Sequence, residues 1–145
     1  MHKSARIKRF DPTLPLPEYK TGGAAGFDLA ARVTTTILAH AVGYVPLNVA
    51  IEPPRDHFTL LAPRSSLHKR GLIPANGVGI IDADYSGDDD ELKAALYNYT
   101  NTNITIEKGE RIMQGVFIPH TRPVFEEVDE MGKRSRGGFG TTGKN

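Results

Sequence analysis

The sequence predicts an all-β domain, a jelly roll or barrel with one short helix and a flexible C-terminal tail. Fifteen Gly and ten Pro residues interrupt short apolar runs throughout the 145-residue chain, a spacing typical of many short strands. No segment shows the sustained 3.6-residue periodicity of a long amphipathic helix. There is also no internal repeat and no βαβ rhythm.

The candidate strands are short and most are enriched in β-branched and aromatic residues. In one of them Leu92, Ala94 and Leu96 alternate with Lys93 and Ala95, which predicts one buried face. In chain order the expected strands are Ala5–Phe10, Val33–Leu38, Tyr44–Ile51, His57–Ala62, Glu91–Tyr99, Asn103–Ile106 and Arg111–Ile118.

One helical turn and a tail complete the expected organisation. Ser65 or Ser66 is a suitable N-cap for a short turn that ends at Gly71. Residues 129–145 are rich in Gly, with Phe139 as their one aromatic residue, so they cannot form a core. We therefore expect a β domain over residues 1–128 and a flexible tail over residues 129–145. The mixture of Arg, Phe and Thr in the tail suits a ligand that carries both an aromatic ring and phosphates.

Composition argues against several classes of function. With 18 basic and 17 acidic side chains the net charge is +1, unlike the basic excess of a general nucleic-acid or membrane binder. The absence of Cys excludes disulfides, thiolate metal sites and a Cys nucleophile. No apolar run approaches the ~20 residues of a membrane span, and no apolar leader follows the basic N-terminus. We expect a soluble, cytoplasmic protein.

The residues that could carry chemistry lie in short separate segments. Asp82 and Asp84 flank Ala83 and would point to the same side of a strand. Such carboxylates can activate water or hold a hydrated metal ion, although a polar turn explains the same residues. The two Ile residues before Asp82 indicate the end of a buried strand.

Three further segments are ambiguous when each is taken alone. Arg64 with Ser65 and Ser66 offers donors to an anion, but a capped helix with a surface Arg has the same pattern. Asp28 in AAGFDL could be a surface residue of a strand. Gln114 in GERIMQG could belong to a solvated hairpin.

Together and in order, the segments resemble the homotrimeric dUTPase family over nearly the whole chain. That family has five short motifs, matched here by AAGFDLAA, PRSSLHKRG, NGVGIIDADYSG, RIMQGVF and RSRGGFGTTG. The resemblance implies a dUTPase-like distorted jelly roll that hydrolyses dUTP to dUMP and pyrophosphate with Mg²⁺. This reaction keeps uracil out of DNA and supplies dUMP for dTMP synthesis. The resemblance also implies a homotrimer in which motifs of different subunits meet at each active site.

The resemblance assigns roles to individual residues. Asp82 matches the base that deprotonates the attacking water, and Asp28 matches the carboxylate that holds Mg²⁺ through water. Tyr85 matches the ring under the deoxyribose. The remaining expected substrate contacts are Asn76 and Gly79 to uracil, Arg64, Ser65, Ser66 and Gln114 to the phosphates, and Arg134, Phe139, Gly140, Thr141 and Thr142 from a tail that closes over the site.

The sequence departs from the family pattern in places, and two other functions stay open. Ser86 stands where the family often has Arg, and Asp88–Asp90 forms a longer link than usual, which we expect to be an exposed turn. A dCTP deaminase shares the fold and an RSSL-type motif, but Ala95 occupies the place of its deaminating Glu. A purely regulatory binder would have little need of Asp82, Gln114 and Phe139 together.

Overall fold

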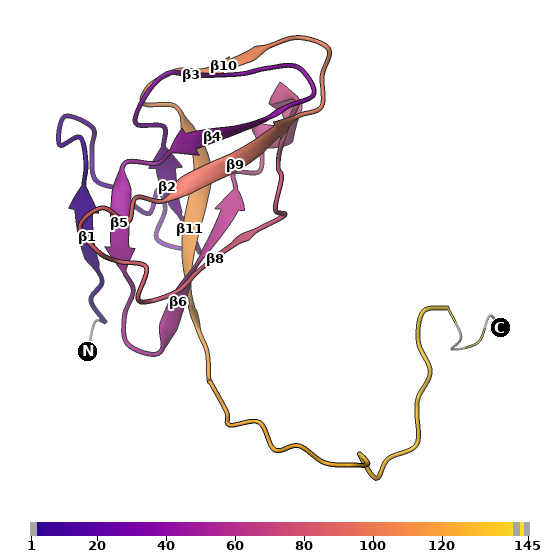
Figure 1. Ribbon diagram of the computed structural model, residues 1–145. Coiled ribbons are helices and arrows are strands. Elements are labelled where there is room, and N and C mark those ends of the chain that lie inside the picture. The colour runs from indigo at the N-terminus through magenta and orange to yellow at the C-terminus, as the bar shows by residue number, and fades with distance from the viewer. Residues whose placement is uncertain (1–2, 141–142, 144–145) are drawn as a thin grey trace.

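The computed structural model describes residues 3–140 and 143, and within them it confirms the all-β class (Figure 1). The described residues form eleven strands and one 3₁₀ turn. The strands are β1 (Arg6–Arg9), β2 (Phe27–Ala30), β3 (Thr35–Ile37), β4 (Val42–Pro46), β5 (Val49–Glu52), β6 (His57–Pro63), β7 (Leu72–Pro74), β8 (Gly79–Ile81), β9 (Lys93–Asn98), β10 (Ile104–Ile106) and β11 (Arg111–Pro119).

Two larger antiparallel sheets contribute side chains to one core, in a jelly-roll-like arrangement. One sheet has the order β2-β11-β6-β8 and the other the order β4-β9-β7, while β1-β5 and β3-β10 form two-stranded ribbons. Leu29 and Leu61 of the first sheet belong to the same buried cluster as Leu72 and Leu96 of the second. The core therefore lies between the two larger sheets.

The predicted alternation in β9 is confirmed. Ala94 and Leu96 are buried, whereas Lys93 is exposed and Ala95 is half-buried. The alternating pattern continues to Asn98, which is buried and donates to the carbonyls of Ile37 and Thr102. The buried amide of Asn98 at the end of the strand thus has hydrogen-bond partners inside the fold.

Three short strands were not among those predicted. β2 (Phe-Asp-Leu-Ala) has no β-branched residue and pairs with β11, so tertiary pairing overrides local propensity. β7 and β8 have three residues each, too few for a period-2 pattern. β8 does lead directly into Asp82, as the two Ile residues indicated, but Ile80 is 66% exposed. The expectation of a buried strand there was wrong.

The single strand expected over Tyr44–Ile51 was also wrong, because the chain turns at Asn48. Asn48 has a φ of 72°, a left-handed conformation that Asn tolerates better than most residues. Its side chain accepts from the Asp11 backbone N–H at 2.6 Å and donates to the Asp11 carbonyl at 3.1 Å. The corner lets β4 pair with β9 while β5 pairs with β1.

The expected short helix is a single 3₁₀ turn, η1 (Leu67–Arg70). Gly71 follows with a φ of 85°, the left-handed C-cap conformation that glycine adopts without steric cost. Ser66 occupies the N-cap position, but its hydroxyl makes no capping hydrogen bond. Leu67 alone anchors the turn in the core.

Beyond β11 the chain leaves the β domain as an extended segment (Figure 1). Residues 120–137 form no strand or helix and are exposed. The domain boundary expected at residue 128 stays a prediction. The flexibility of the tail and its closing movement stay predictions. No helix within the described part of the chain is long and apolar enough to cross a membrane.

Candidate active site

A pocket of about 320 Å³ gathers residues from three of the five motif segments. We call it the anion pocket. It is lined by Lys20, Thr21, Ala24, Ala25, Gly26, Asp28, Arg64, Ser65 and Gln114. These residues are far apart in the sequence, so the fold brings them together.

The register of β11 explains this convergence. β11 pairs with β2 on one side and with β6 on the other. Gln114 lies opposite Asp28 of β2 and opposite Ala62 of β6, and Arg64 follows directly after β6. A one-residue slip of β11 would turn Gln114 to the other face of the sheet.

Asp28 is shared by two guanidinium groups. Its Oδ1 lies 3.2 Å from Arg64 Nε and its Oδ2 lies 3.2 Å from Arg111 Nη1. Arg64 Nη1 also donates to the Arg111 carbonyl at 3.2 Å. The Asp28 side chain is only 16% exposed. One carboxylate thus orients two cations and leaves an excess of positive charge beside the pocket, which favours an anionic ligand.

Gln114 and the two serines supply neutral hydrogen-bonding groups. Gln114 Nε2 donates to the Pro63 carbonyl at 3.0 Å, which fixes the direction of the amide. Gly26 permits this position, because a Cβ at Gly26 would lie 2.5 Å from Gln114 Oε1. Ser65 and Ser66 are exposed, and Ser65 lines the pocket. Ser66 is the N-cap of η1, but its hydroxyl makes no capping hydrogen bond.

The turn between β7 and β8, two strands of different sheets, presents the predicted uracil contacts at a different place. Gly77 has a φ of 74°, its N–H donates to the Pro74 carbonyl, and the Val78 N–H donates to the Asn76 carbonyl at 2.9 Å. Asn76 is exposed at the tip of this tight turn. Gly79 lets β8 approach β6 closely, since a Cβ there would lie 3.0 Å from Leu61 Cβ.

Asp82 and Tyr85 lie in the turn after β8, outside the anion pocket. The Tyr85 N–H donates to the Asp82 carbonyl at 3.1 Å, and the Tyr85 hydroxyl donates to the Glu91 carbonyl at 3.1 Å. The Tyr85 side chain is nevertheless 41% exposed. Asp82 and Asp84 line a separate wide depression beside His57 and His120. In a single chain, the predicted base therefore does not face the predicted phosphate contacts.

The acidic link after Tyr85 is the exposed turn expected from the sequence. Asp90 Oδ2 accepts from the Gly87 N–H at 2.8 Å, and Ser86 Oγ donates to the Ala83 carbonyl at 2.9 Å. From β1, Lys8 Nζ donates to the Asp88 carbonyl at 2.6 Å. These contacts stabilise the turn that carries Tyr85. Within the residues described, no cluster of three or more His, Asp and Glu side chains forms a metal site.

The tail residues lie away from the anion pocket and from the segment that carries Asn76, Asp82 and Tyr85. Arg134, Phe139 and Gly140 are exposed, on a segment that runs away from the β domain in Figure 1. The Phe139 ring makes no contact that buries it. Thr141 and Thr142 lie outside the described residues. The structure thus separates the predicted site residues into three groups.

A family model described as dUTPase matches residues 13–143. The chain belongs to the dUTPase family. Two similar relatives are named deoxyuridine 5'-triphosphate nucleotidohydrolase. The relative from Legionella pneumophila (strain Paris) is 38% identical, with 99% of both chains covered. The relative from Tolumonas auensis is 41% identical, with 94% of this chain and 93% of the relative covered.

Solved dUTPase structures have the same fold. The crystal structure of dUTPase from Streptococcus mutans is 34% identical with a TM-score of 0.75, and the match covers 82% of this chain and 98% of that one. A variant dUTPase of Staphylococcus bacteriophage 80alpha, with dUpNHpp, is 25% identical with a TM-score of 0.79. That match covers 92% of this chain and 94% of the phage chain.

Two cations of this dUTPase-family site were not among the predicted site residues. Arg111 lies in the same GERIMQG segment as Gln114, but its ion pair with Asp28 depends on the β2–β11 pairing. Lys20 lines the anion pocket and precedes the first motif. A basic residue directly before the Thr-Gly-Gly loop was the available sequence indication, but nothing local shows where that loop folds.

Proposed function

We propose that the protein hydrolyses dUTP to dUMP and pyrophosphate in a site assembled from three copies of the chain. The observation that carries this proposal is the anion pocket, where Asp28, Arg64, Ser65 and Gln114 meet in a dUTPase-family chain. Both relatives named above act on deoxyuridine 5'-triphosphate by name, and the phage 80alpha structure holds dUpNHpp.

The triphosphate binds in the anion pocket. Arg64 offers a planar fork of donors held in place by Asp28 and the Arg111 carbonyl, and such forks match phosphate oxygens. Ser65, Ser66 and Gln114 add hydrogen bonds without adding charge. Because the donors are held in place before the substrate arrives, they stabilise developing charge without reorganising during the reaction.

Asp82 acts as the general base. Its carboxylate takes a proton from water as the water oxygen forms a bond to the α-phosphorus. The bond from that phosphorus to the bridging oxygen of the leaving pyrophosphate breaks on the opposite side. The exposure of Asp82 suits this role, because in the assembled site a neighbouring copy and the substrate would cover it.

Base and sugar selection belong to the turn between β7 and β8 and to the turn that follows β8. Asn76 and the backbone around Gly79 pair with the uracil edge, and cytosine reverses one donor of that edge. A thymine methyl group would collide with the tight turn at Gly77, whose N–H is bonded to Pro74. The Tyr85 ring lies under the deoxyribose, where its hydrogen bond to the Glu91 carbonyl holds it, and excludes a ribose 2'-hydroxyl.

A magnesium ion fits the donors of the anion pocket. Asp28 is one carboxylate beside a phosphate site and already carries two Arg partners, which suits contact through water better than direct ligation. Magnesium usually keeps several waters and binds largely through substrate phosphates. When bound, it would neutralise charge on the triphosphate; Asp28 would orient its water shell.

Assembly of three copies would join the separated groups. Ile80 on β8 is 66% exposed, and Phe125 in the extended segment after β11 is 98% exposed. Such apolar surface is typical of sites that pack against another chain. In the proposed homotrimer, one copy supplies the anion pocket, a second supplies Asn76, Asp82 and Tyr85, and a third supplies the tail. Arg134 and Phe139 then cover the bound nucleotide. A cytoplasmic location stays a prediction.

An assay of two products tests the reaction. The protein is incubated with Mg²⁺ and dUTP, dCTP, dTTP or UTP, and pyrophosphate and ammonia are measured together. We expect pyrophosphate from dUTP alone. Ammonia from dCTP would assign the protein to deamination instead, an outcome disfavoured by the uncharged Ala95 side chain at the expected place of a deaminating Glu.

The role of Asp82 is tested by Asp82→Asn beside Asp89→Asn, an equal charge change in the neighbouring acidic turn. Loss of a general base typically costs about 100-fold or more in kcat. We expect that loss for Asp82→Asn with dUpNHpp binding retained, and wild-type turnover for Asp89→Asn. Equal turnover in the two variants would contradict the assignment of Asp82.

A further inference from the structure

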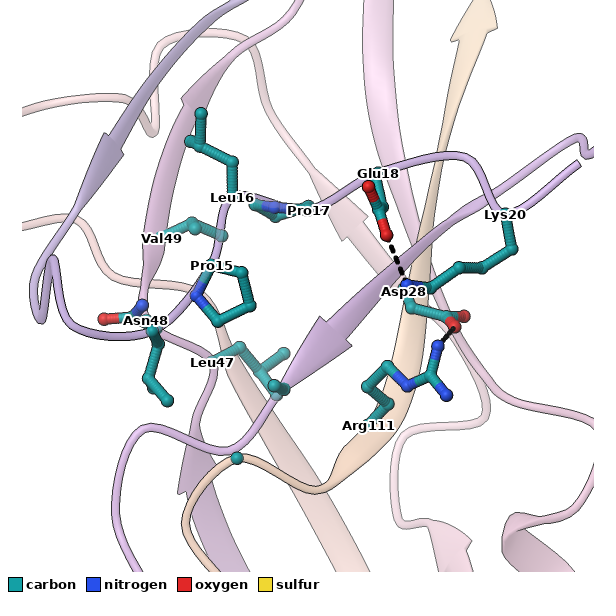
Figure 2. Close-up of a pocket in the computed structure, with 13 residues that line it drawn as sticks. Pro15, Leu16, Pro17, Glu18, Lys20, Asp28, Leu47, Asn48, Val49 and Arg111 are labelled. Carbon is teal, nitrogen blue, oxygen red and sulfur yellow. Dashed lines mark hydrogen bonds and ion pairs between the residues drawn. The ribbon is translucent and has the colours of Figure 1, made fainter.

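Lys20 stands between the anion pocket and a second pocket of about 280 Å³. The second pocket lies under the Leu14–Glu18 segment and is shown in Figure 2. Lys20 and Asp28 line both pockets, whereas Glu18 and Arg111 line the second pocket alone. The Lys20 side chain is therefore part of both pockets.

The ammonium group of Lys20 is held by a neighbouring carboxylate. Lys20 Nζ donates to Glu18 Oε1 at 2.5 Å, and Figure 2 shows the two side chains pointing toward one another near the Asp28–Arg111 ion pair. The ammonium group of Lys20, aided by Arg111, lowers the pKa of Glu18 below its ordinary value. Glu18 is thus a charged partner at neutral pH.

This ion pair is easily exchanged. The side chain of Lys20 is 46% exposed and that of Glu18 is 67% exposed, and exposed ion pairs contribute little net stability. Lys also presents a compact charge on a flexible four-carbon stem. A highly charged anion in the anion pocket can therefore compete with Glu18 for this cation.

The charges around the pocket favour that exchange. Lys20, Arg64 and Arg111 are the cations, and Glu18 and Asp28 are their carboxylate partners. The Asp28 side chain is 16% exposed and lies between its two Arg partners, whereas Glu18 is exposed and can turn to solvent. Of these three cations, Lys20 therefore loses its carboxylate partner, Glu18, at the lowest cost in free energy.

We propose that Lys20 is a further substrate-binding residue, whose ammonium group exchanges the Glu18 carboxylate for a phosphate oxygen of the bound nucleotide. The proposal rests on the proposed function of the anion pocket. Glu18 then acts as a competitor that holds Lys20 in place until the nucleotide arrives. Removing Lys20 weakens binding of the triphosphate, and removing the charge of Glu18 strengthens it.

The test measures dissociation constants of dUpNHpp and of deoxyuridine, which has no phosphate. Lys20→Met should weaken dUpNHpp binding about tenfold, since a charge-assisted hydrogen bond to phosphate is lost and only a weak exposed pair offsets it. Deoxyuridine binding should not change, and Lys20→Arg should restore most of the affinity. Lys3→Met, the same charge change at the N-terminus, is the matched control.

A double-mutant cycle separates direct exchange from a general effect of charge. Glu18→Gln should tighten dUpNHpp binding in the wild-type background and have no effect when Lys20 is already Met. Additive effects would instead indicate long-range electrostatics or an action of Glu18 through Arg111. Either additivity or equal binding by Lys20→Met and Lys3→Met would overturn the proposal.

The wild-type protein distinguishes failure of this inference from failure of the proposed function. Wild-type turnover of dUTP with unchanged dUpNHpp binding in Lys20→Met would refute the role of Lys20 alone. Absence of both dUTP turnover and dUpNHpp binding in the wild-type protein would refute the proposed function and, with it, the role of Lys20.

Discussion

Glu91 holds together the corner where β4 ends and β5 begins, and its neutralisation should destabilise the fold. Its side chain is 7% exposed. Arg32 donates to both of its carboxylate oxygens, at 2.7 and 3.0 Å, and the Asn48 backbone N–H donates to Oε2 at 2.9 Å. The carboxylate thus accepts three hydrogen bonds beside a backbone held at a φ of 72°. It also raises the pKa of Arg32.

The substitution Glu91→Gln keeps the shape but cannot accept all three bonds. If the amide oxygen faces Arg32 Nε and the Asn48 N–H, the amide nitrogen faces a second donor of Arg32. Breaking a buried ion pair by changing one partner costs about 3–5 kcal/mol. The Arg32 side chain is 34% exposed and can regain water, so we expect a loss of about 2–3 kcal/mol in the free energy of unfolding.

Urea denaturation at one fixed protein concentration measures this loss, because assembly makes apparent stability depend on concentration. The matched control is Glu52→Gln, which removes an exposed cross-strand pair with Arg6 at 2.8 Å. That pair should contribute only about 0–1 kcal/mol. A similar shift of the denaturation midpoint for both variants, with an unchanged slope, would show that the Glu91 carboxylate does not stabilise the corner at Asn48.

Two further predictions concern the pH dependence of stability and the geometry of the anion pocket. Hydrogen bonds from Lys108 and Thr13 lower the pKa of Asp11 well below its usual value. The charged Asp11 carboxylate therefore stabilises the fold at pH values above its pKa in the unfolded chain, and this stabilisation is lost as the pH falls through its pKa in the folded protein. Asp11→Asn should therefore destabilise the protein at pH 7 and make little difference in strong acid; thermal denaturation across that range checks this, and a constant difference would contradict it. Gly26→Ala places a Cβ 2.5 Å from Gln114 Oε1 and should lower kcat/KM for dUTP about tenfold or more, because small misplacements of binding groups are costly. Gly22→Ala, with no neighbour within 4 Å, is the control, and equal kinetics in the two variants would disprove the role of Gly26.

The fold class follows from local patterns, but the corners of the fold do not. Alternation in β9 marks its buried face in the sequence alone. Pro46 and Asn48 both interrupt the apolar run over Tyr44–Ile51, but the turn at Asn48 depends on contacts with Asp11 and Glu91. These partners are distant in the chain, so local propensity cannot reveal the break.

For the candidate site too, the sequence identifies some residues but not the contacts that depend on the fold. The motif order was enough to name Asp28, Arg64, Ser65 and Gln114, and the structure brings these four together. The position of Lys20 depends on how the loop before β2 folds. The ion pair of Arg111 with Asp28 depends on the pairing of β11 with β2. The distance between Asp82 and the anion pocket in one chain is likewise a property of the fold that sequence order does not contain.

The most direct test of the assembled site mixes two inactive variants. Asp82→Asn keeps an intact anion pocket, and Arg64→Ala keeps an intact base. Each is prepared alone, and the two are then unfolded and refolded together at equal concentrations, with formation of mixed oligomers checked by native mass spectrometry. If the pocket and the base of each site come from different copies, about one quarter of the sites combine both intact groups when all randomly assembled trimers, homotrimers included, are counted. We expect the mixture to recover roughly this share of wild-type dUTP turnover. Mixed oligomers no more active than the separate variants would contradict it and place the complete site within one chain.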